Sequence, residues 1–203
     1  MLIELSARRS VPVMTDLLVV AALEEELAEL IRRHPEITVL VTGPGKVLAA
    51  SGLGAALAAT RPAAVLVLGT AGGLTPGHQG VHEIAVVGQH DFDAAALESL
   101  VGRLYGAAIT LAAHGEHLAT GDVFVADAEH VARLAARGYG LVDMEGYAYA
   151  HVCAAAGVPL RIVKAVSDGA EDDAVTTWTA NVQQCAVLLA DWYDGQVDLP
   201  VVP

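Results

Sequence analysis

The chain has 203 residues, of which 54% are hydrophobic and 17% are charged, and its formal net charge is -13. This length and composition exclude a disordered chain and predict a single domain over residues 1–203, with its core at about 17–192. The few Lys and Arg are scattered, so nucleic acid is excluded as a partner because its phosphates would be repelled. No apolar run reaches the roughly 20 residues of a membrane span, and the first residues lack a signal-peptide pattern. We therefore expect no membrane contact and a cytoplasmic location.

Short apolar runs alternate with longer Ala-rich segments along the chain. Strands are predicted at 16–23, 37–43, 63–74, 82–92, 108–113, 121–126, 140–145 and 160–168, and helices at 24–34, 46–60, 128–137, 146–157 and 176–193. Apolar strands separated by helices predict a central, mostly parallel sheet that helices cover on both faces. The predicted fold class is α/β with three layers.

Two glycine-containing segments follow predicted strands. The segment "TGPGKVLAASG" has Leu48 where a dinucleotide fingerprint needs glycine, and Leu40 and Val47 where a P-loop needs glycine and Ser or Thr. It therefore predicts a tight turn and argues against NAD or ATP. The segment "GTAGGL", residues 69–74, offers flexible backbone and the hydroxyl of Thr70, and it fits either a ligand loop or a simple turn.

The cysteines and histidines do not indicate a metal or redox site. Cys153 and Cys185 have no CxxC spacing and are predicted to be small core residues. The eight histidines are dispersed without ligand spacing. We therefore expect no metal and no cofactor.

Acidic residues follow three of the predicted strands. Glu24, Glu25 and Glu26 come after "LLVVAAL", Glu145 opens the helix beginning "GYAYAHV", and Asp168 ends the strand "RIVKAVS". Acidic residues at helix starts also favour the helix dipole, which is the simpler explanation for at least two of the three glutamates. Ligands of α/β sheets gather at the carboxyl ends of strands, so we expect the remaining acids to meet there.

Three converging acids and one aromatic side chain suit a site for a nucleoside. Breaking an N-ribosyl bond passes through a ribosyl cation, as in other glycoside chemistry that uses carboxylate pairs. Such a reaction needs one carboxylate for the ribose hydroxyls, an acid for the departing base and a base that orients water. Phe124, in "GDVFVAD", offers a flat surface for the base.

The segments "AALEEEL", "GTAGGL", "GDVFV", "VDMEGYAYAHVC" and "VKAVSDGA" occur in an order that resembles the 5'-methylthioadenosine/S-adenosylhomocysteine nucleosidases of the purine nucleoside phosphorylase superfamily. The resemblance covers roughly residues 17–192. It implies a nucleoside phosphorylase-like fold, a small purine nucleoside as the binding partner and a homodimer.

The resemblance also implies a role for each matching residue. In the polar part of the site, Glu26 orients the attacking water, Glu145 accepts hydrogen bonds from the 2' and 3' hydroxyls, and Asp168 passes a proton to purine N7 with Ser167 beside it. Around the substrate, Met144 packs on the ribose, Phe124 stacks on the base, the Val125 backbone contacts the purine edge, and Thr70 stands where the family usually has serine. Asp143 is expected to support the turn or to face solvent.

Acid at the nucleophile position suits water and repels phosphate, so a hydrolase is favoured over a phosphorylase. Only 17 positions separate Glu26 from Gly43, and the loop after "VVGQHDFD" is short, which departs from the family pattern. A shorter lid would admit a larger 5' group. Futalosine or aminodeoxyfutalosine hydrolysis, a purine nucleoside phosphorylase, and a non-catalytic nucleoside-binding homologue therefore remain as alternatives.

Overall fold

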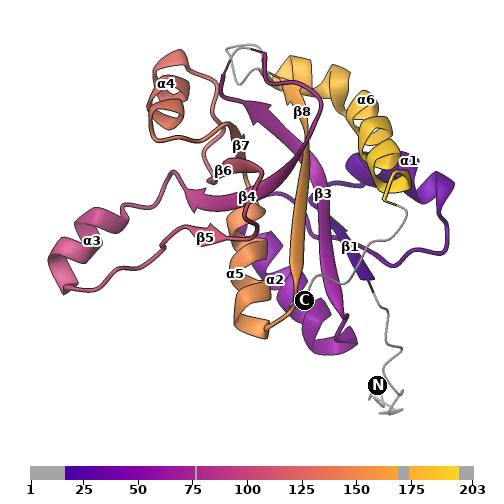
Figure 1. Ribbon diagram of the computed structural model, residues 1–203, viewed down its shortest axis with the longest axis horizontal. Coiled ribbons are helices and arrows are strands. Elements are labelled where there is room, and N and C mark those ends of the chain that lie inside the picture. Colours follow the sequence, from indigo (N-terminus) through magenta and orange to yellow (C-terminus); the bar gives the residue numbers. More distant parts are fainter. Residues whose placement is uncertain (1–16, 76, 169–173, 197–203) are drawn as a thin grey trace, which may run out of the picture.

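The computed structural model describes residues 17–75, 77–168 and 174–196 (Figure 1). The strands are β1 (Leu17–Ala21), β2 (Val39–Val41), β3 (Ala64–Gly73), β4 (Val81–Gln89), β5 (Ile109–Thr110), β6 (Glu116–Thr120), β7 (Leu141–Asp143) and β8 (Leu160–Asp168). The helices are α1 (Glu24–Arg33), α2 (Lys46–Thr60), α3 (Ala94–Val101), α4 (Ala128–Ala136), α5 (Gly146–Ala156) and α6 (Ala174–Asp194). None of the described helices is long and apolar enough to cross a membrane.

The strands form one mixed sheet. Its order is β2-β1-β3-β7-β6-β4-β5, and β8 pairs with both β3 and β4. The pairs of β1 with β2 and β3, of β3 with β8, and of β6 with β4 and β7 are parallel. Because β8 joins β3 to β4, the pairings close into a ring that runs through β3, β7, β6, β4 and β8. This confirms the predicted mixed, mostly parallel sheet and adds a closure that the alternation of elements does not reveal.

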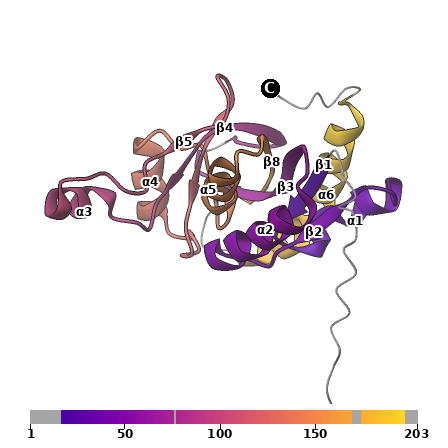
Figure 2. The ribbon, with the colours of Figure 1, turned by 90° about the horizontal axis from the view of Figure 1, so that it is seen from below.

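Alternating side chains of the central strands supply two separate cores. On β1, Leu18 and Val20 pack with residues of α2 and α5, whereas Val19 and Ala21 pack with residues of α1 and α6. Successive side chains of a strand point to opposite faces, so a strand that is apolar throughout needs a helical layer on each side. Figures 1 and 2 show these two helix pairs, which complete the three layers.

One predicted strand is wrong. Residues 121–126 form no strand, and the strand of this region is β6, five residues earlier. Of the apolar residues that suggested it, Val125 is buried, but Val123 and Phe124 are 56% and 47% exposed. These side chains line a cavity, so the segment is apolar because of the site and not because it lies in the sheet.

The connection between β4 and β6 carries the helix α3, which the sequence did not predict. Asp93 caps it by accepting a hydrogen bond from the Ala96 amide at 2.9 Å, and Gly102 ends it in the left-handed conformation. None of the residues of α3 is buried. Figures 1 and 2 both show α3 at the end of an arm that projects from the rest of the chain.

Candidate active site

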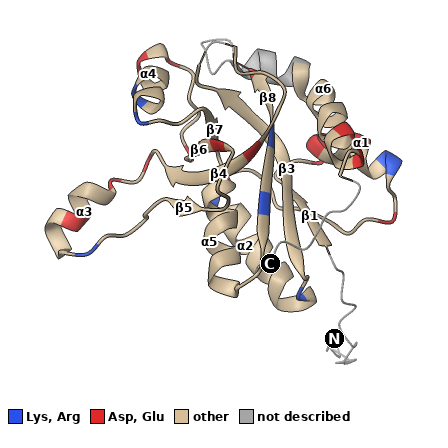
Figure 3. Cartoon of the chain, in the orientation of Figure 1, with Lys and Arg blue, Asp and Glu red and all other residues tan. Residues whose placement is uncertain are grey.

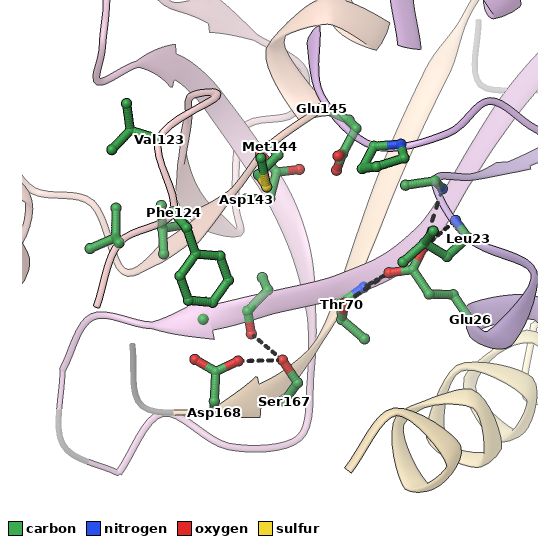
Figure 4. A pocket seen from close by; sticks show the side chains of 16 residues that line it. Leu23, Glu26, Thr70, Val123, Phe124, Asp143, Met144, Glu145, Ser167 and Asp168 are labelled. Atoms are coloured by element: carbon green, nitrogen blue, oxygen red, sulfur yellow. Dashed lines mark hydrogen bonds between the residues drawn. The ribbon is translucent and has the colours of Figure 1, made fainter. Parts of the chain in front are cut away.

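A cavity of about 230 Å³ lies where several strands end. Its wall contains all eight residues that the sequence assigned to the site: Glu26, Thr70, Phe124, Val125, Met144, Glu145, Ser167 and Asp168. Figure 4 shows the side chains of these residues, apart from the unlabelled Val125, around a common space. The structure thus brings together residues separated by as many as 142 positions, while their individual roles stay predictions.

The Glu26 carboxylate is buried in the first turn of α1 and holds two segments together. Its Oε2 accepts hydrogen bonds from the backbone amides of Ala22 and Leu23, at 3.2 and 3.1 Å. Its Oε1 accepts from the backbone amide and the hydroxyl of Thr70, at 2.7 and 2.8 Å. A carboxylate has about four acceptor positions, so these four donors use the full set. Glu26 therefore fixes the end of β1 against β3.

Glu145 lies at the N-cap of α5, where the chain leaves β7, and it is 6% exposed. Its Oε1 accepts a hydrogen bond from the Gly45 amide at 2.8 Å. That amide belongs to the last residue of the Gly43-Pro44-Gly45 turn. Both glycines of the turn have positive φ angles, which confirms the turn predicted there. Burial, reinforced by the nearby Asp143 carboxylate, raises the pKa of Glu145 to about 7. Both protonation states of Glu145 are therefore accessible near neutral pH.

Asp168 is the last residue of β8 and lies beside Ser167. The Ser167 hydroxyl donates a hydrogen bond to Asp168 Oδ2 at 2.7 Å. The backbone carbonyl of Ser167 in turn accepts from the Asn181 side chain of α6, at 2.7 Å. The end of β8 is thus anchored by α6, and one oxygen of the Asp168 carboxyl has a fixed orientation (Figure 4).

Phe124 and Val125 come from the loop between β6 and α4. The Val125 side chain is buried in a small cluster with Leu134 and Val142, which anchors the loop. Phe124 is 47% exposed and lines the cavity. A half-exposed aromatic ring on an anchored loop provides an apolar face that a planar ring can cover.

Asp143 and Lys164 form a buried ion pair, in which Asp143 belongs to the cavity wall and Lys164 does not. Lys164 Nζ lies 2.9 Å from Asp143 Oδ2, and the two side chains are 3% and 1% exposed. Asp143 also accepts hydrogen bonds from the Thr120 hydroxyl, at 2.6 Å, and from the Gly146 amide, at 2.9 Å. Asp143 does support the turn into α5, as expected, but its carboxylate lies in the interior and does not face solvent.

The neighbouring carboxylates decide the charge of Lys164. Burial alone would lower the pKa of its ammonium group, but the carboxylates of Asp143, Glu145 and Glu26 outweigh burial and raise it. Lys164 therefore stays charged and offsets part of the negative charge of the cavity wall. The sequence analysis missed this residue, although a single Lys inside the apolar run "RIVKAVS" indicates a buried partner.

The side chains of Lys164 and Glu26 lie close to the backbone of Gly69. A Cβ atom at this position would lie 3.1 Å from Lys164 Nζ and 3.2 Å from Glu26 Oε1. A side chain here would require the ammonium group or the carboxylate to move by a few tenths of an ångström. The "GTAGGL" segment is not a turn, because residues 69–73 form the end of β3, and Thr70 within it lines the cavity.

The cavity wall carries four carboxyl groups, from Glu26, Asp143, Glu145 and Asp168. Among the described residues that line it, none is Lys or Arg. Such a surface can accept hydrogen bonds from hydroxyls, transfer protons and hold water, but it repels an anion. The arrangement is suited to a neutral, hydroxyl-rich ligand with a flat apolar ring.

Comparisons with known proteins agree with this chemistry. Residues 27–191 match the family model described as the Phosphorylase superfamily. A 5'-methylthioadenosine/S-adenosylhomocysteine nucleosidase of Actinobacillus succinogenes is 33% identical over 162 residues, which cover 68% of this chain and 70% of that protein.

Solved structures share the fold. A futalosine hydrolase of Helicobacter pylori superposes with a TM-score of 0.82 at 22% identity, over 91% of this chain and 98% of that one. A 5'-methylthioadenosine/S-adenosylhomocysteine nucleosidase of the same organism, solved with butyl-thio-DADMe-Immucillin-A, gives 0.78 at 22% identity, over 92% and 99%. The chain belongs to the Phosphorylase superfamily and, within it, to the 5'-methylthioadenosine/S-adenosylhomocysteine nucleosidases, which are N-glycosyl hydrolases.

Proposed function

We propose that this protein hydrolyses the N-ribosyl bond of 5'-methylthioadenosine or S-adenosylhomocysteine and releases adenine. The observation that carries the proposal is the convergence of Glu26, Glu145 and Asp168 from three strand ends on one cavity. A substrate of this kind places the enzyme in methionine salvage, and the cytoplasm is the location that we propose.

Asp168 is proposed to donate the proton that makes adenine a neutral leaving group. Ser167 donates its hydroxyl hydrogen to Asp168 Oδ2 and so fixes the orientation of the carboxyl group. We expect the other oxygen, Oδ1, to carry the proton to purine N7. A positioned general acid contributes about 10²- to 10⁴-fold to the rate. The ring of Phe124 is the surface on which the base stacks, with the Val125 backbone at its edge.

Glu145 and Met144 are proposed to bind the ribose. An ionised carboxylate can accept from both hydroxyls of a diol, and the backbone amide of Gly45 already orients Oε1. The pKa of Glu145, which burial raises to about 7, means that the substrate diol selects the ionised form from a mixture. Substrate binding is then coupled to loss of a proton from Glu145 at slightly acidic pH.

Glu26 and Thr70 are proposed to orient the attacking water. The three backbone donors to Glu26 are part of the fold, but the Thr70 hydroxyl can rotate. A water that donates to Glu26 Oε1 can replace the Thr70 hydroxyl, which then becomes a second partner for that water. The charged Lys164 near Glu26 offsets part of the negative charge of this region.

Hydrolysis is favoured over phosphorolysis by the charge of the cavity. Phosphorolysis needs cationic groups that bind a phosphate dianion. The cavity wall presents carboxyl groups, and Lys164 is 2% exposed and is paired with Asp143. Lys and Arg elsewhere are spread over several elements and do not gather around the strand ends (Figure 3).

Futalosine or aminodeoxyfutalosine is the second candidate substrate. The segment between β4 and β6 projects as an arm and does not cover the cavity as a lid would (Figure 1). None of its described residues lines the cavity. An uncovered cavity accepts a larger 5' substituent than the methylthio group. The cleaved bond and the proposed catalytic residues are the same for both substrates.

A homodimer is part of the proposal. The arm carries apolar side chains that contact little of their own chain, including Leu100 at 80%, Val101 at 51% and Leu104 at 51% exposure. Clusters of exposed apolar residues on a projecting element are typical of protein interfaces. A second copy of the chain is the partner that would cover them.

The test is base release from purified protein, followed by chromatography. The substrates are methylthioadenosine, S-adenosylhomocysteine, adenosine, inosine and aminodeoxyfutalosine, each with and without phosphate. We expect adenine from the first two at a rate that phosphate does not change. Release that requires phosphate would identify a phosphorylase, a preference for aminodeoxyfutalosine would select the second candidate, and no release from any of them would support a non-catalytic homologue.

A further inference from the structure

A group of three side chains of the kinds that bind metal ions lies outside the proposed nucleosidase cavity. It consists of His78, in the connection between β3 and β4, His82 on β4, and Glu116, the first residue of β6. One potential ligand atom from each residue lies within 4.8 Å of the others. Among the described residues, this is the group of His, Cys, Asp or Glu side chains that could hold a metal ion. The sequence analysis expected no metal because the histidines lack ligand spacing, but the sheet brings Glu116 to residues more than 30 positions away.

The distance between His78 and Glu116 favours a shared ion over a direct bond. His78 Nε2 lies 3.4 Å from Glu116 Oε1. A charge-assisted hydrogen bond between an imidazolium and a carboxylate is shorter, about 2.7–2.9 Å. Two ligands about 2.1 Å from a tetrahedral ion are separated by about 3.4 Å. The two groups are therefore spaced as ligands of one ion.

Both imidazole rings have a hydrogen-bond partner on one of their nitrogen atoms. His78 Nδ1 is hydrogen-bonded to the Thr75 hydroxyl, and His82 Nε2 lies 3.0 Å from the Gln79 carbonyl oxygen. A carbonyl oxygen only accepts, so His82 carries its hydrogen on Nε2 and the lone pair on Nδ1. Metal-binding histidines almost always have such an outer partner, which fixes both the tautomer and the ring.

The backbone around the group leaves room for the carboxylate. A Cβ atom at Gly140 would lie 2.4 Å from Glu116 Oε2 and 3.2 Å from His78 Nε2. Gly140 is held in place because its amide donates to the His117 carbonyl and its carbonyl accepts from the Leu74 amide. The side chains of His78 and Glu116 are 20% and 35% exposed, so an ion can enter from solvent and still be partly shielded.

We propose that His78, His82 and Glu116 bind one divalent transition-metal cation of the Zn²⁺ class. Two imidazoles and one carboxylate form a ligand set that zinc uses with water at the fourth position, whereas Mg²⁺ and Ca²⁺ prefer oxygen ligands. The ion ties the connection after β3 to the start of β6. Ser167 and Asp168 lie on the wall of a cavity of about 900 Å³ that His78 also lines, so the ion stabilises a segment next to the proton donor.

The experiment is a calorimetric titration of the full, tag-free chain with ZnCl₂, in parallel with His78→Ala, His82→Ala and Glu116→Gln. We expect one equivalent to bind, and each substitution to weaken binding at least tenfold. Removal of an outer partner, in Thr75→Val, should weaken it roughly tenfold or more. His114→Ala and His117→Ala are matched controls, because both residues are exposed and close in sequence to Glu116, and they should bind zinc like the wild type.

A second measurement does not depend on every variant folding equally well. Zinc should raise the Tm of the wild type and of the two controls, since an ion that binds only the folded state stabilises it. Equal titrations of the wild type and the three ligand variants would overturn the proposal and assign binding to scattered surface histidines. Absence of a Tm shift with bound zinc would also overturn it. Neither readout uses turnover, so failure here is distinct from failure of the proposed nucleosidase activity.

Discussion

Lys164 connects the stability of the protein with the charge of the site. Its ammonium group contacts Asp143, and burial of this pair costs free energy that the ionic contact and the hydrogen bonds to Asp143 offset. Glu26 and Glu145 also act on it electrostatically. Removal of this ammonium group would leave the three carboxylates of Asp143, Glu145 and Glu26 without its compensating charge.

We therefore predict that Lys164→Met destabilises the protein by about 3–5 kcal/mol, as expected for one half of a buried pair. The loss should be larger at pH 8 than at pH 5.5, because protonation relieves the repulsion between the remaining carboxylates. Urea unfolding of both proteins at pH 5.5 and pH 8 measures this loss of stability. Lys46→Met is the matched control: Lys46 pairs with Asp91 at 2.6 Å with about 20% of its side chain exposed, so its loss should cost about 1 kcal/mol or less. Similar losses for the two variants would contradict the argument.

Asp168→Asn tests the proposed proton donor. The amide oxygen can still accept from the Ser167 hydroxyl, so we expect the fold and the urea midpoint to be unchanged. Without a transferable proton, kcat for base release should fall by about 10²- to 10⁴-fold. Glu129→Gln, on the exposed outer face of α4, is the control and should leave kcat unaltered. A rate for Asp168→Asn close to that of the wild type would remove Asp168 from the catalytic role.

At the residue scale, the sequence identified side chains that face the cavity better than those behind it. Acids at strand ends are recognisable because the carboxyl ends of strands meet at one edge. Lys164 and Asp143 lie within apolar runs, and only the register of β8 and of β7 with β3 shows that they approach each other. A pairing between distant strands is a long-range property that local pattern does not contain.

At the scale of elements, α3 is the helix whose environment is least complete. The helix buries none of its residues, and it lies at the end of an arm that projects from the rest of the chain (Figure 2). Burial of a Leu side chain contributes about 1.5–3 kcal/mol, so an interface that covers several of these residues gains a substantial free energy. The arm is therefore the element through which we expect the proposed homodimer to form.

We predict that Leu100→Glu shifts the protein from dimer to monomer in sedimentation experiments. A charge at this position would be buried without a partner in the interface, whereas in the monomer it is solvated. The circular dichroism spectrum should be unchanged, because Leu100 is 80% exposed within its own chain. Glu98→Gln, on the same helix, is the control and should sediment like the wild type. An unchanged mass for Leu100→Glu would exclude Leu100 from a dimer contact.

The elements themselves followed the sequence pattern wherever their apolar residues serve the core. The helix predicted at 46–60 has the same bounds as α2, and the strand at 160–168 has those of β8. The prediction failed at 121–126, where apolar side chains line the cavity, and it gave no helix at 94–101, where apolar residues are exposed. Periodicity reports which side chains avoid water, but it does not distinguish a core from a ligand surface or a subunit interface.

At the scale of the whole molecule, titration of buried groups determines how stability changes with pH. Glu145 has a pKa of about 7 in the folded protein, above its ordinary value near 4.5. The folded state therefore binds a proton that the unfolded state has released, and the contribution of Glu145 to stability decreases as pH rises from about 4.5 to 7. His90 acts in the opposite direction: burial lowers its pKa, so its contribution increases as pH rises through about 6.5.

Because Glu145 and His90 have opposite effects, the pH dependence of wild-type stability does not reveal the contribution of Glu145 alone. Comparison with Glu145→Gln does. A neutral amide of the same shape removes a cost that grows as pH rises from about 4.5 to 7 and is complete above pH 7. We predict that this substitution raises the free energy of unfolding by roughly 1–3 kcal/mol at pH 8, since one pKa unit corresponds to about 1.4 kcal/mol, and by less than half as much at pH 5.5. The measurement is the urea midpoint of both proteins at the two pH values, with Glu129→Gln as a surface control. An equal effect at pH 5.5 and pH 8 would show that ionisation of Glu145 does not destabilise the folded protein. The same substitution should abolish binding of the ribose diol if the proposed role is right. Glu145 would then weaken the fold and yet be needed to bind the substrate. Selection for binding, and not for stability, would retain such a residue at this position.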